Sequence, residues 1–152
     1  MTITPLRAFA LAVALLAAGL AMILAPGLAQ SPPDIRVTDG DTIRIDRQRV
    51  RLIGFDTPEI RRAKCPYERE KGLAAKARLQ QLVDAGGISV NFVPCACPAG
   101  TEGTRRCNFG RKCAVMTANG KDVADILIAE GLARRLTCTA TSCPKLEGWC
   151  GG

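Results

Sequence analysis

Three carboxylates and one arginine lie close together in the sequence, between residues 41 and 59: Asp41, Asp56, Glu59 and Arg51. Carboxylate oxygens are the ligands that a hard cation prefers. A guanidinium stays protonated and binds phosphate oxygens in a bidentate manner. This group of residues therefore predicts chemistry on a phosphate, assisted by a hard cation.

A short hairpin is expected to bring these residues together. Apolar residues alternate with arginines in residues 43–45 and again in 50–52, which is typical of strands with one buried face, and Asp46-Arg47-Gln48 turns the chain between them. An antiparallel hairpin centred there places the beginning of the first strand beside the end of the second. We therefore expect Asp41 to lie close to Asp56. Two carboxylates at that distance repel each other unless a cation lies between them.

Each of the two acidic segments has a structural explanation when it is taken alone. Asp39-Gly40 is a common turn signal, and Pro58 restricts Thr57 to an extended conformation, as in a loop. The expected proximity of the two segments is what favours a metal site. Two carboxylates and a backbone carbonyl would not complete the shell of Ca²⁺, so waters and a substrate phosphate would have to fill the remaining positions.

The sequence contains no histidine. This excludes Ser-His-Asp and Cys-His nucleophile systems, metal sites of the H-E-x-x-H type and any histidine general base. Hydrolysis by this chain would have to use carboxylates, arginines and a metal ion.

The N-terminal segment has the features of a secretory signal peptide over residues 1–29. An apolar run covers residues 8–25, and small residues precede an expected cut after Ala29. The run is also long enough for an uncleaved membrane anchor, which is the alternative. We expect residues 30–152 to form one exported domain, secreted or periplasmic, without stable membrane association after cleavage.

All eight cysteines lie in the expected exported part, and the whole chain has a net charge of +7. An even number of cysteines in an exported chain indicates a disulfide framework, whose pairing the sequence does not reveal. The alternative is a zinc site, but paired C-x₂-C knuckles and histidines are missing. Cys95 and Cys97 are too close to pair comfortably with each other. The basic excess suits a polyanionic partner, although many basic proteins bind nothing anionic.

Hydrophobic patterns predict five strands and two helices. The expected elements are three short strands within 34–55, a helix from about 73 that ends at Gly86-Gly87, strands at 88–92 and 112–118, and a helix over 122–130. This order predicts an α+β, mainly β fold, a partly open five-stranded barrel of the oligonucleotide/oligosaccharide-binding (OB) type that is stabilised by disulfides. The cysteine-rich tail, residues 137–152, shows no useful periodicity.

Four segments resemble, in the same order, the staphylococcal nuclease (thermonuclease) family. They are V-T-D-G-D-T at 37–42, R-L-I-G-F-D-T-P-E at 51–59, F-G-R at 109–111 and G-K-D-V with E-G-L-A within 120–133. The resemblance runs from about residue 35 to residue 136. It implies a five-stranded OB-fold barrel with helices and calcium-dependent hydrolysis of phosphodiester bonds in DNA and RNA.

The resemblance also implies a calcium site. Asp41 and Asp56 would bind Ca²⁺ through their carboxylates, and Thr57 would add its main-chain carbonyl.

Three further residues would act on the substrate if the resemblance holds. Glu59 would take a proton from the attacking water, while Arg51 and Arg111 would bind the phosphate and stabilise charge in the transition state. The substrate would be DNA or RNA, single-stranded or frayed, and the protein a monomer. The preference between DNA and RNA, and the end at which cleavage occurs, stay open.

The chain departs from the family near the expected nucleotide base, where Asn108 and Thr137 replace aromatic and basic residues. Cys107 and Cys113 flank Arg111, and we hypothesise that a disulfide from either one holds this arginine in place. Two alternatives to an enzyme remain. One is a non-catalytic module of the same fold that binds nucleic acid or a protein in the cell envelope, and the other is a disulfide-rich structural protein.

Overall fold

The structure is a computed structural model, and it describes residues 34–151. The expected signal peptide, residues 1–29, lies outside the described residues. In chain order, the elements are β1 (Ile35–Asp39), β2 (Thr42–Ile45), β3 (Gln48–Leu52), β4 (Phe55–Asp56), α2 (Pro66–Asp84), β5 (Ile88–Val93), the 3₁₀ helix η1 (Asn108–Gly110), β6 (Lys112–Ala118), β7 (Lys121–Asp122), α3 (Val123–Ala129) and β8 (Arg134–Arg135). The predicted α+β class is confirmed, as are both helices and all five main strands.

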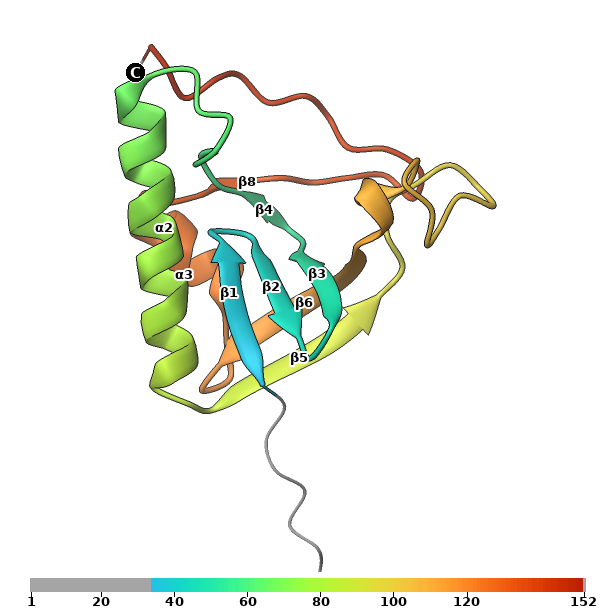
Figure 1. Cartoon of the computed structure of the whole chain (residues 1–152), viewed down its shortest axis with the longest axis horizontal. Coiled ribbons are helices and arrows are strands. Elements are labelled where there is room, and N and C mark those ends of the chain that lie inside the picture. Colours follow the sequence, from blue (N-terminus) through green and yellow to red (C-terminus); the bar gives the residue numbers. More distant parts are fainter. Residues whose placement is uncertain (1–33, 152) are drawn as a thin grey trace, which may run out of the picture. The chain divides into compact units, whose positions relative to one another are not determined.

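The main sheet has the strand order β1-β2-β3-β6-β5, with β7 beside β6 (Figure 1). Strands β3 and β6 run parallel, and the other neighbours are antiparallel. The expected barrel is not closed, because the end strands β1 and β5 are not hydrogen-bonded to each other in residues 34–151. Helix α2 instead packs against β1 at that edge of the sheet (Figure 1).

The inner face of the sheet forms the hydrophobic core. Val37, Ile43 and Val50 face one another across β1, β2 and β3, and each is buried. Leu79 from α2 and Leu127 from α3 complete the same cluster. Burying each such side chain stabilises the fold by about 1.5–3 kcal/mol. Since side chains alternate along a strand, the residues between these positions point to the outer face, where the chemistry lies.

Helix α2 begins earlier than the sequence predicted, at Pro66 rather than near residue 73. Cys65 is the N-cap residue, and its Sγ accepts a hydrogen bond from the backbone N–H of Glu68. The Glu68 carboxylate in turn accepts one from the backbone N–H of Lys64, at 2.6 Å. These caps satisfy amide groups that a helix leaves free at its start. They initiate the helix within a polar segment that has no hydrophobic period, while its end before Gly86 is as predicted.

All eight cysteines form disulfides: Cys65–Cys150, Cys95–Cys113, Cys97–Cys107 and Cys138–Cys143. The expected disulfide framework is therefore confirmed, and the zinc alternative is wrong. Cys95 and Cys97 each pair elsewhere, as the spacing predicted. Four disulfides indicate an oxidising environment. No helix within residues 34–151 has the length and apolar character needed to span a membrane.

The tail after β8 returns across the molecule to the beginning of α2 (Figure 1), where Cys150 is joined to Cys65. Trp149, near the end of this tail, is buried, and the Arg134 guanidinium lies 3.8 Å from the centre of its ring. Arg134 also donates to the backbone carbonyl of Glu147, at 3.0 Å. Because Arg134 pairs with Asp56 across strands β8 and β4, the tail is anchored directly beside one of the predicted metal ligands.

Candidate active site

The hairpin of β2 and β3 brings the two acidic segments together as the sequence predicted. Thr42 lies opposite Arg51, and the backbone N–H of Leu52 donates to the carbonyl of Asp41 at 2.8 Å. Asp41 therefore lies beside the end of β3, after which the chain continues directly to Asp56. Asp41 is buried and Asp56 is half-buried.

The cation found between the two carboxylates is the guanidinium of Arg51. Its Nη2 atom lies 3.0 Å from Oδ2 of Asp41 and 3.1 Å from Oδ1 of Asp56. The family resemblance implied that Arg51 binds a phosphate and that a metal ion lies in this place. The pairing of β2 with β3 indicates the contact between Arg51 and Asp41, because Arg51 lies opposite Thr42, the residue next to Asp41.

Two further acids, Asp39 and Glu59, add negative charge to this cluster. The pKa of Asp39 is raised by burial and by the nearby Asp41. Glu59 is exposed at the rim, and partial desolvation followed by the charges of Asp39, Asp41 and Asp56 raises its pKa. Burial also raises the pKa of Asp56, against the lowering effect of Arg51. Asp39, in the turn before Asp41, belongs to this acidic cluster and was not among the site residues predicted from the sequence.

The donors present fit a hard cation chemically. Asp41 and Asp56 direct one oxygen each to the same nitrogen, at 3.0 and 3.1 Å, so both carboxylates face one cationic position, and the adjacent Thr57 is buried. Three ligand atoms within 4.8 Å of one another occur in one group of the described residues 34–151, formed by Cys65, Glu68 and Cys150. Its cysteines are joined in a disulfide. The acidic site thus offers an incomplete shell, which leaves room for water and substrate oxygens.

Arg111 is held over the outer face of the same strands by three hydrogen bonds. Its Nη1 donates to Oγ1 of Thr42 at 3.0 Å, its Nε to the backbone carbonyl of Asn108 at 3.1 Å, and its Nη2 to Oδ1 of Asn108 at 2.7 Å. The Thr42 hydroxyl donates in turn to Oδ1 of Asp41 at 2.8 Å. Burial and the nearby Arg51 lower the pKa of Arg111. The two predicted phosphate-binding arginines therefore lie close together.

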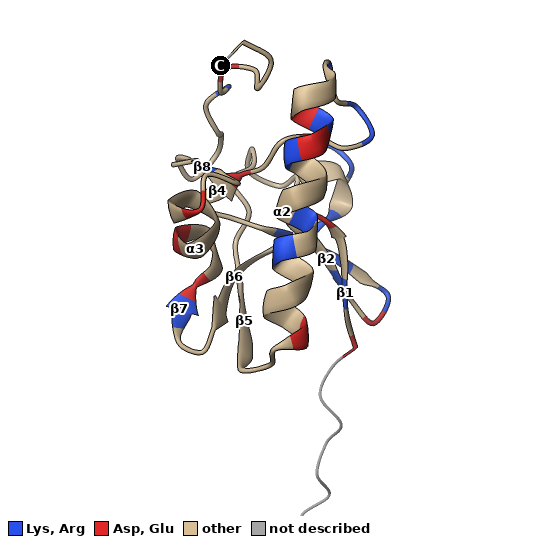
Figure 2. Cartoon of the chain, turned by 90° about the vertical axis from the view of Figure 1, so that its left-hand side faces the viewer, with Lys and Arg blue, Asp and Glu red and all other residues tan. Residues whose placement is uncertain are grey.

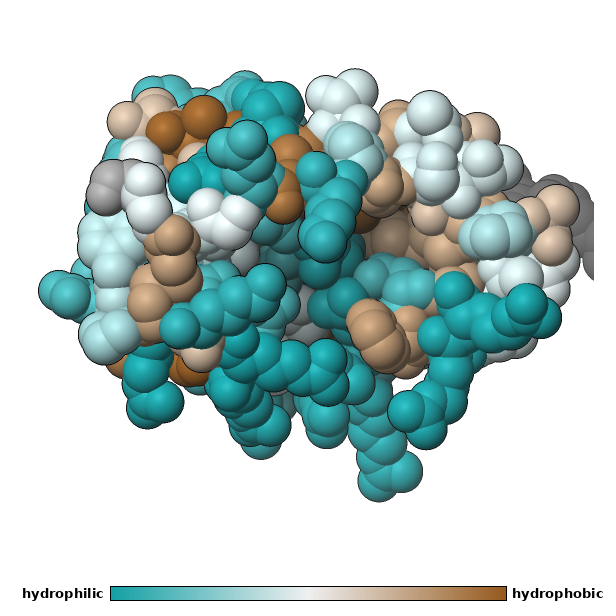
Figure 3. Space-filling model, turned by 90° about the horizontal axis from the view of Figure 1, so that it is seen from above, coloured by the Kyte–Doolittle hydropathy of each residue, from teal (hydrophilic) through white to brown (hydrophobic). Residues whose placement is uncertain are grey.

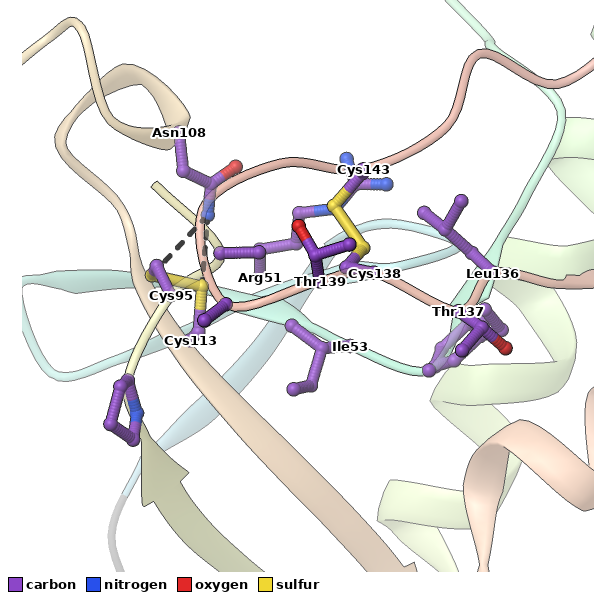
Figure 4. A pocket seen from close by; sticks show the side chains of 15 residues that line it. Arg51, Ile53, Cys95, Asn108, Cys113, Leu136, Thr137, Cys138, Thr139 and Cys143 are labelled. Atoms are coloured by element: carbon purple, nitrogen blue, oxygen red, sulfur yellow. Dashed lines mark hydrogen bonds between the residues drawn. A yellow bond between two sulfur atoms is a disulfide. The ribbon is translucent and has the colours of Figure 1, made fainter. Parts of the chain in front are cut away.

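Asn108 connects Arg111 to a disulfide. Its side-chain amide donates to Sγ of Cys113 at 3.3 Å, and Cys113 is bonded to Cys95 (Figure 4). Asn108 has a φ of 51°, a left-handed conformation that asparagine tolerates better than most residues. Both cysteines that flank Arg111 are thus in disulfides, as hypothesised, although the contact runs through Asn108. The sequence showed no signal for this contact.

A cavity of about 550 Å³ lies next to Arg51. Its wall is mainly apolar and includes Ile53, Phe55 and Leu136, and the Cys95–Cys113 and Cys138–Cys143 disulfides line it as well (Figure 4). Asn108 and Thr137, the two departures from the family pattern, both line it. Seen from above, the surface has a hollow between hydrophilic side chains and paler, less polar ones (Figure 3).

Comparisons with known proteins agree with the chemistry of this site. No protein-family profile matches the chain. It is 34% identical over 106 residues to endonuclease YncB of Bacillus subtilis (strain 168), which covers 65% of this chain and 44% of that protein. It is also 34% identical over 106 residues to the SPbeta prophage-derived endonuclease YokF of the same organism, covering 32% of that protein. Both relatives are named endonucleases. The chain spans less than half the length of each.

Proposed function

We propose that this protein is a calcium-dependent nuclease that hydrolyses phosphodiester bonds of DNA, RNA or both, with a fold of the staphylococcal nuclease type. The observation that carries the proposal is the meeting of acidic residues and two arginines, Arg51 and Arg111, on one side of the β2–β3 hairpin. The similarity to two proteins named endonucleases supports it. The disulfides agree with a secreted or periplasmic protein.

In this proposal, Asp41 and Asp56 hold Ca²⁺ together with the main-chain carbonyl of Thr57. A bound Ca²⁺ would polarise a phosphate oxygen and activate water. In the structure, the Arg51 guanidinium occupies the position between the two carboxylates. A cation held there would take over the charge compensation of both acids, and Arg51 would then be available to bind the substrate phosphate.

Glu59 is the proposed general base. Its side chain is exposed and accessible to a water molecule, and partial desolvation, the largest cause of its raised pKa, does not depend on the charges of Asp41 and Asp56 that a cation would offset. A raised pKa makes a carboxylate a stronger base and moves it toward the pH at which the reaction proceeds. Glu59 would accept the proton as the water oxygen attacks phosphorus, while the P–O bond to the leaving nucleotide oxygen breaks and this oxygen takes a proton from solvent.

Arg111 would stabilise the negative charge that grows on the phosphate oxygens. Three hydrogen bonds fix its guanidinium before a substrate arrives. A donor that is already oriented does not have to reorganise during the reaction, and the loss of one such contact typically costs about 10²–10³ in rate.

The test uses the purified, oxidised protein and denatured DNA, with Ca²⁺ or with a chelator. We expect cleavage that depends on Ca²⁺ and falls by about 10²-fold or more in Glu59→Gln. Glu70→Gln on α2 is the matched control, since it removes an exposed glutamate from another surface. A folded wild-type protein that binds DNA without cutting it would refute the nuclease and support the non-catalytic binding module.

A further inference from the structure

Three arginines form a row across the outer face of the sheet, next to the candidate active site. Arg36 of β1 lies opposite Arg44 of β2, and Arg44 lies opposite Arg49 of β3. All three are exposed, because the alternate residues of these strands face the core. Figure 2 shows Lys and Arg along β1, β2 and the adjoining turn. We refer to Arg36, Arg44 and Arg49 as the arginine row.

The charge of the arginine row is largely uncompensated. Arg36 pairs with Asp34 at 3.0 Å, whereas Arg44 and Arg49 form no salt bridge with any acid of residues 34–151. Like charges directly opposite each other on neighbouring strands destabilise a sheet. An anionic ligand across this face would remove that repulsion.

The arginine row continues into the active site. Two residues further along the strands, on the same face, Thr42 lies opposite Arg51, a step of about 7 Å in an antiparallel sheet. Thr42 holds Arg111 through its hydroxyl. Arg49 is also one of the charges that act to lower the pKa of Arg111, after burial and Arg51. A ligand on the row would therefore be continuous with one bound by Arg51 and Arg111.

We propose that the arginine row is a second phosphate-binding site, which holds the backbone of a nucleic-acid strand next to the phosphate being cleaved. This inference rests on the proposed function and adds the form of the substrate, a strand of several nucleotides rather than a single diester. The strands β1–β3 carry no aromatic side chain. The row thus offers contacts to phosphates and no aromatic platform for base stacking, so we expect binding there to be independent of base sequence.

A binding experiment tests this surface separately from catalysis. Arg44→Gln/Arg49→Gln is made in Glu59→Gln protein, and the affinity for a single-stranded oligonucleotide of about 16 nucleotides is measured by fluorescence anisotropy at several salt concentrations. Two lost contacts should reduce the slope of log K against log salt by about 1.4, which corresponds to roughly 25-fold weaker binding at about 0.1 M salt relative to 1 M.

Two matched variants accompany this experiment. Lys121→Gln/Lys145→Gln removes the same net charge from exposed positions on β7 and the tail and should leave the slope nearly unchanged. Arg44→Lys/Arg49→Lys keeps the charge and should keep most of the slope. Equal losses in the Arg44/Arg49 and Lys121/Lys145 glutamine variants would show a general charge effect and overturn the proposal.

Cleavage gives the second readout. In protein with Glu59 intact, Arg44→Gln/Arg49→Gln should lower kcat/KM for the oligonucleotide and leave hydrolysis of a nitrophenyl ester of thymidine 5′-phosphate unchanged. A parallel loss on both substrates would overturn the inference. If the wild type cuts neither substrate yet the slope changes as expected, the nuclease proposal fails and the phosphate-binding surface stands.

Discussion

Asn108 should control how well Arg111 works, although it need not touch the substrate. Asn108→Gly removes the side-chain oxygen that accepts from Nη2 of Arg111 at 2.7 Å. It keeps the backbone carbonyl that accepts from Nε, and glycine readily adopts the φ of 51° at this position. The substitution therefore removes one of three contacts to Arg111 without imposing backbone strain.

The expected magnitude follows from the bond that is lost. A hydrogen bond to a charged group contributes about 1.5–3 kcal/mol, which corresponds to about 10- to 100-fold in rate if the bond orients Arg111 in the transition state. The bonds to Thr42 and to the backbone remain, so the effect should be smaller than the roughly 10²–10³-fold loss expected for Arg111→Ala. We expect a lower kcat with little change in KM.

The assay is steady-state cleavage of single-stranded DNA in Ca²⁺ by Asn108→Gly, Arg111→Ala and the double variant. Asn119→Gly is the control, because Asn119 has a nearly identical φ of 50° and lies in the turn between β6 and β7. The double variant should be no slower than Arg111→Ala, since both changes act on one guanidinium. An unchanged kcat in Asn108→Gly, or losses that simply multiply, would refute the positioning role.

Two further predictions concern stability. Raised carboxyl pKa values in the acidic cluster mean that the folded protein binds protons there more tightly than the unfolded chain. In chelator, the wild type should therefore lose stability relative to Glu59→Gln as the pH rises from about 4 through the raised pKa values. The check is the urea midpoint of the wild type and of Glu59→Gln across this pH range. Ca²⁺ should bring the two midpoints together, and a difference between them that does not change with pH would contradict the prediction. Replacing Cys65 and Cys150 by serine, which opens a separation of 85 residues, should cost about 4–5 kcal/mol, against about 2 kcal/mol for Cys138 and Cys143 with a separation of 5. Denaturant unfolding of both variants measures this difference, and equal costs would rule out the loop-length explanation.

The hairpin was predictable because the sequence pattern that specifies it lies within one short segment of the chain. Alternation in residues 43–45 and 49–52, on either side of the turn, fixes which side chains are buried, and a register error of one residue would expose the core. This is why the proximity of Asp41 and Asp56 could be inferred from the sequence and is found in the structure. Alternation also predicted the strand at 88–92, which extends to Val93 in the structure.

The contacts that set the detail of the site are not local. The link from Arg111 through Asn108 to the Cys95–Cys113 disulfide joins β6 to the loop after β5, and no spacing rule selects this pairing among eight cysteines. Strands β4 and β8 have two residues each, which is too short for any periodicity. The strand pair that fixes the position of Asp56 could therefore not be predicted from the sequence.

The tail gives the protein an optical reporter of its own. Trp149 is the single tryptophan of the chain, and its indole ring stacks on Arg134 of β8, the residue that pairs with Asp56 of β4. Its fluorescence therefore reports whether the tail is seated on β4 and β8, while circular dichroism reports the helices and the sheet. Coincident transitions by the two methods would mean that tail and sheet unfold together. An earlier transition in fluorescence would mean that the tail detaches from an otherwise folded domain. The contact between the tail and β8, the strand that pairs with the Asp56 strand, would then be lost.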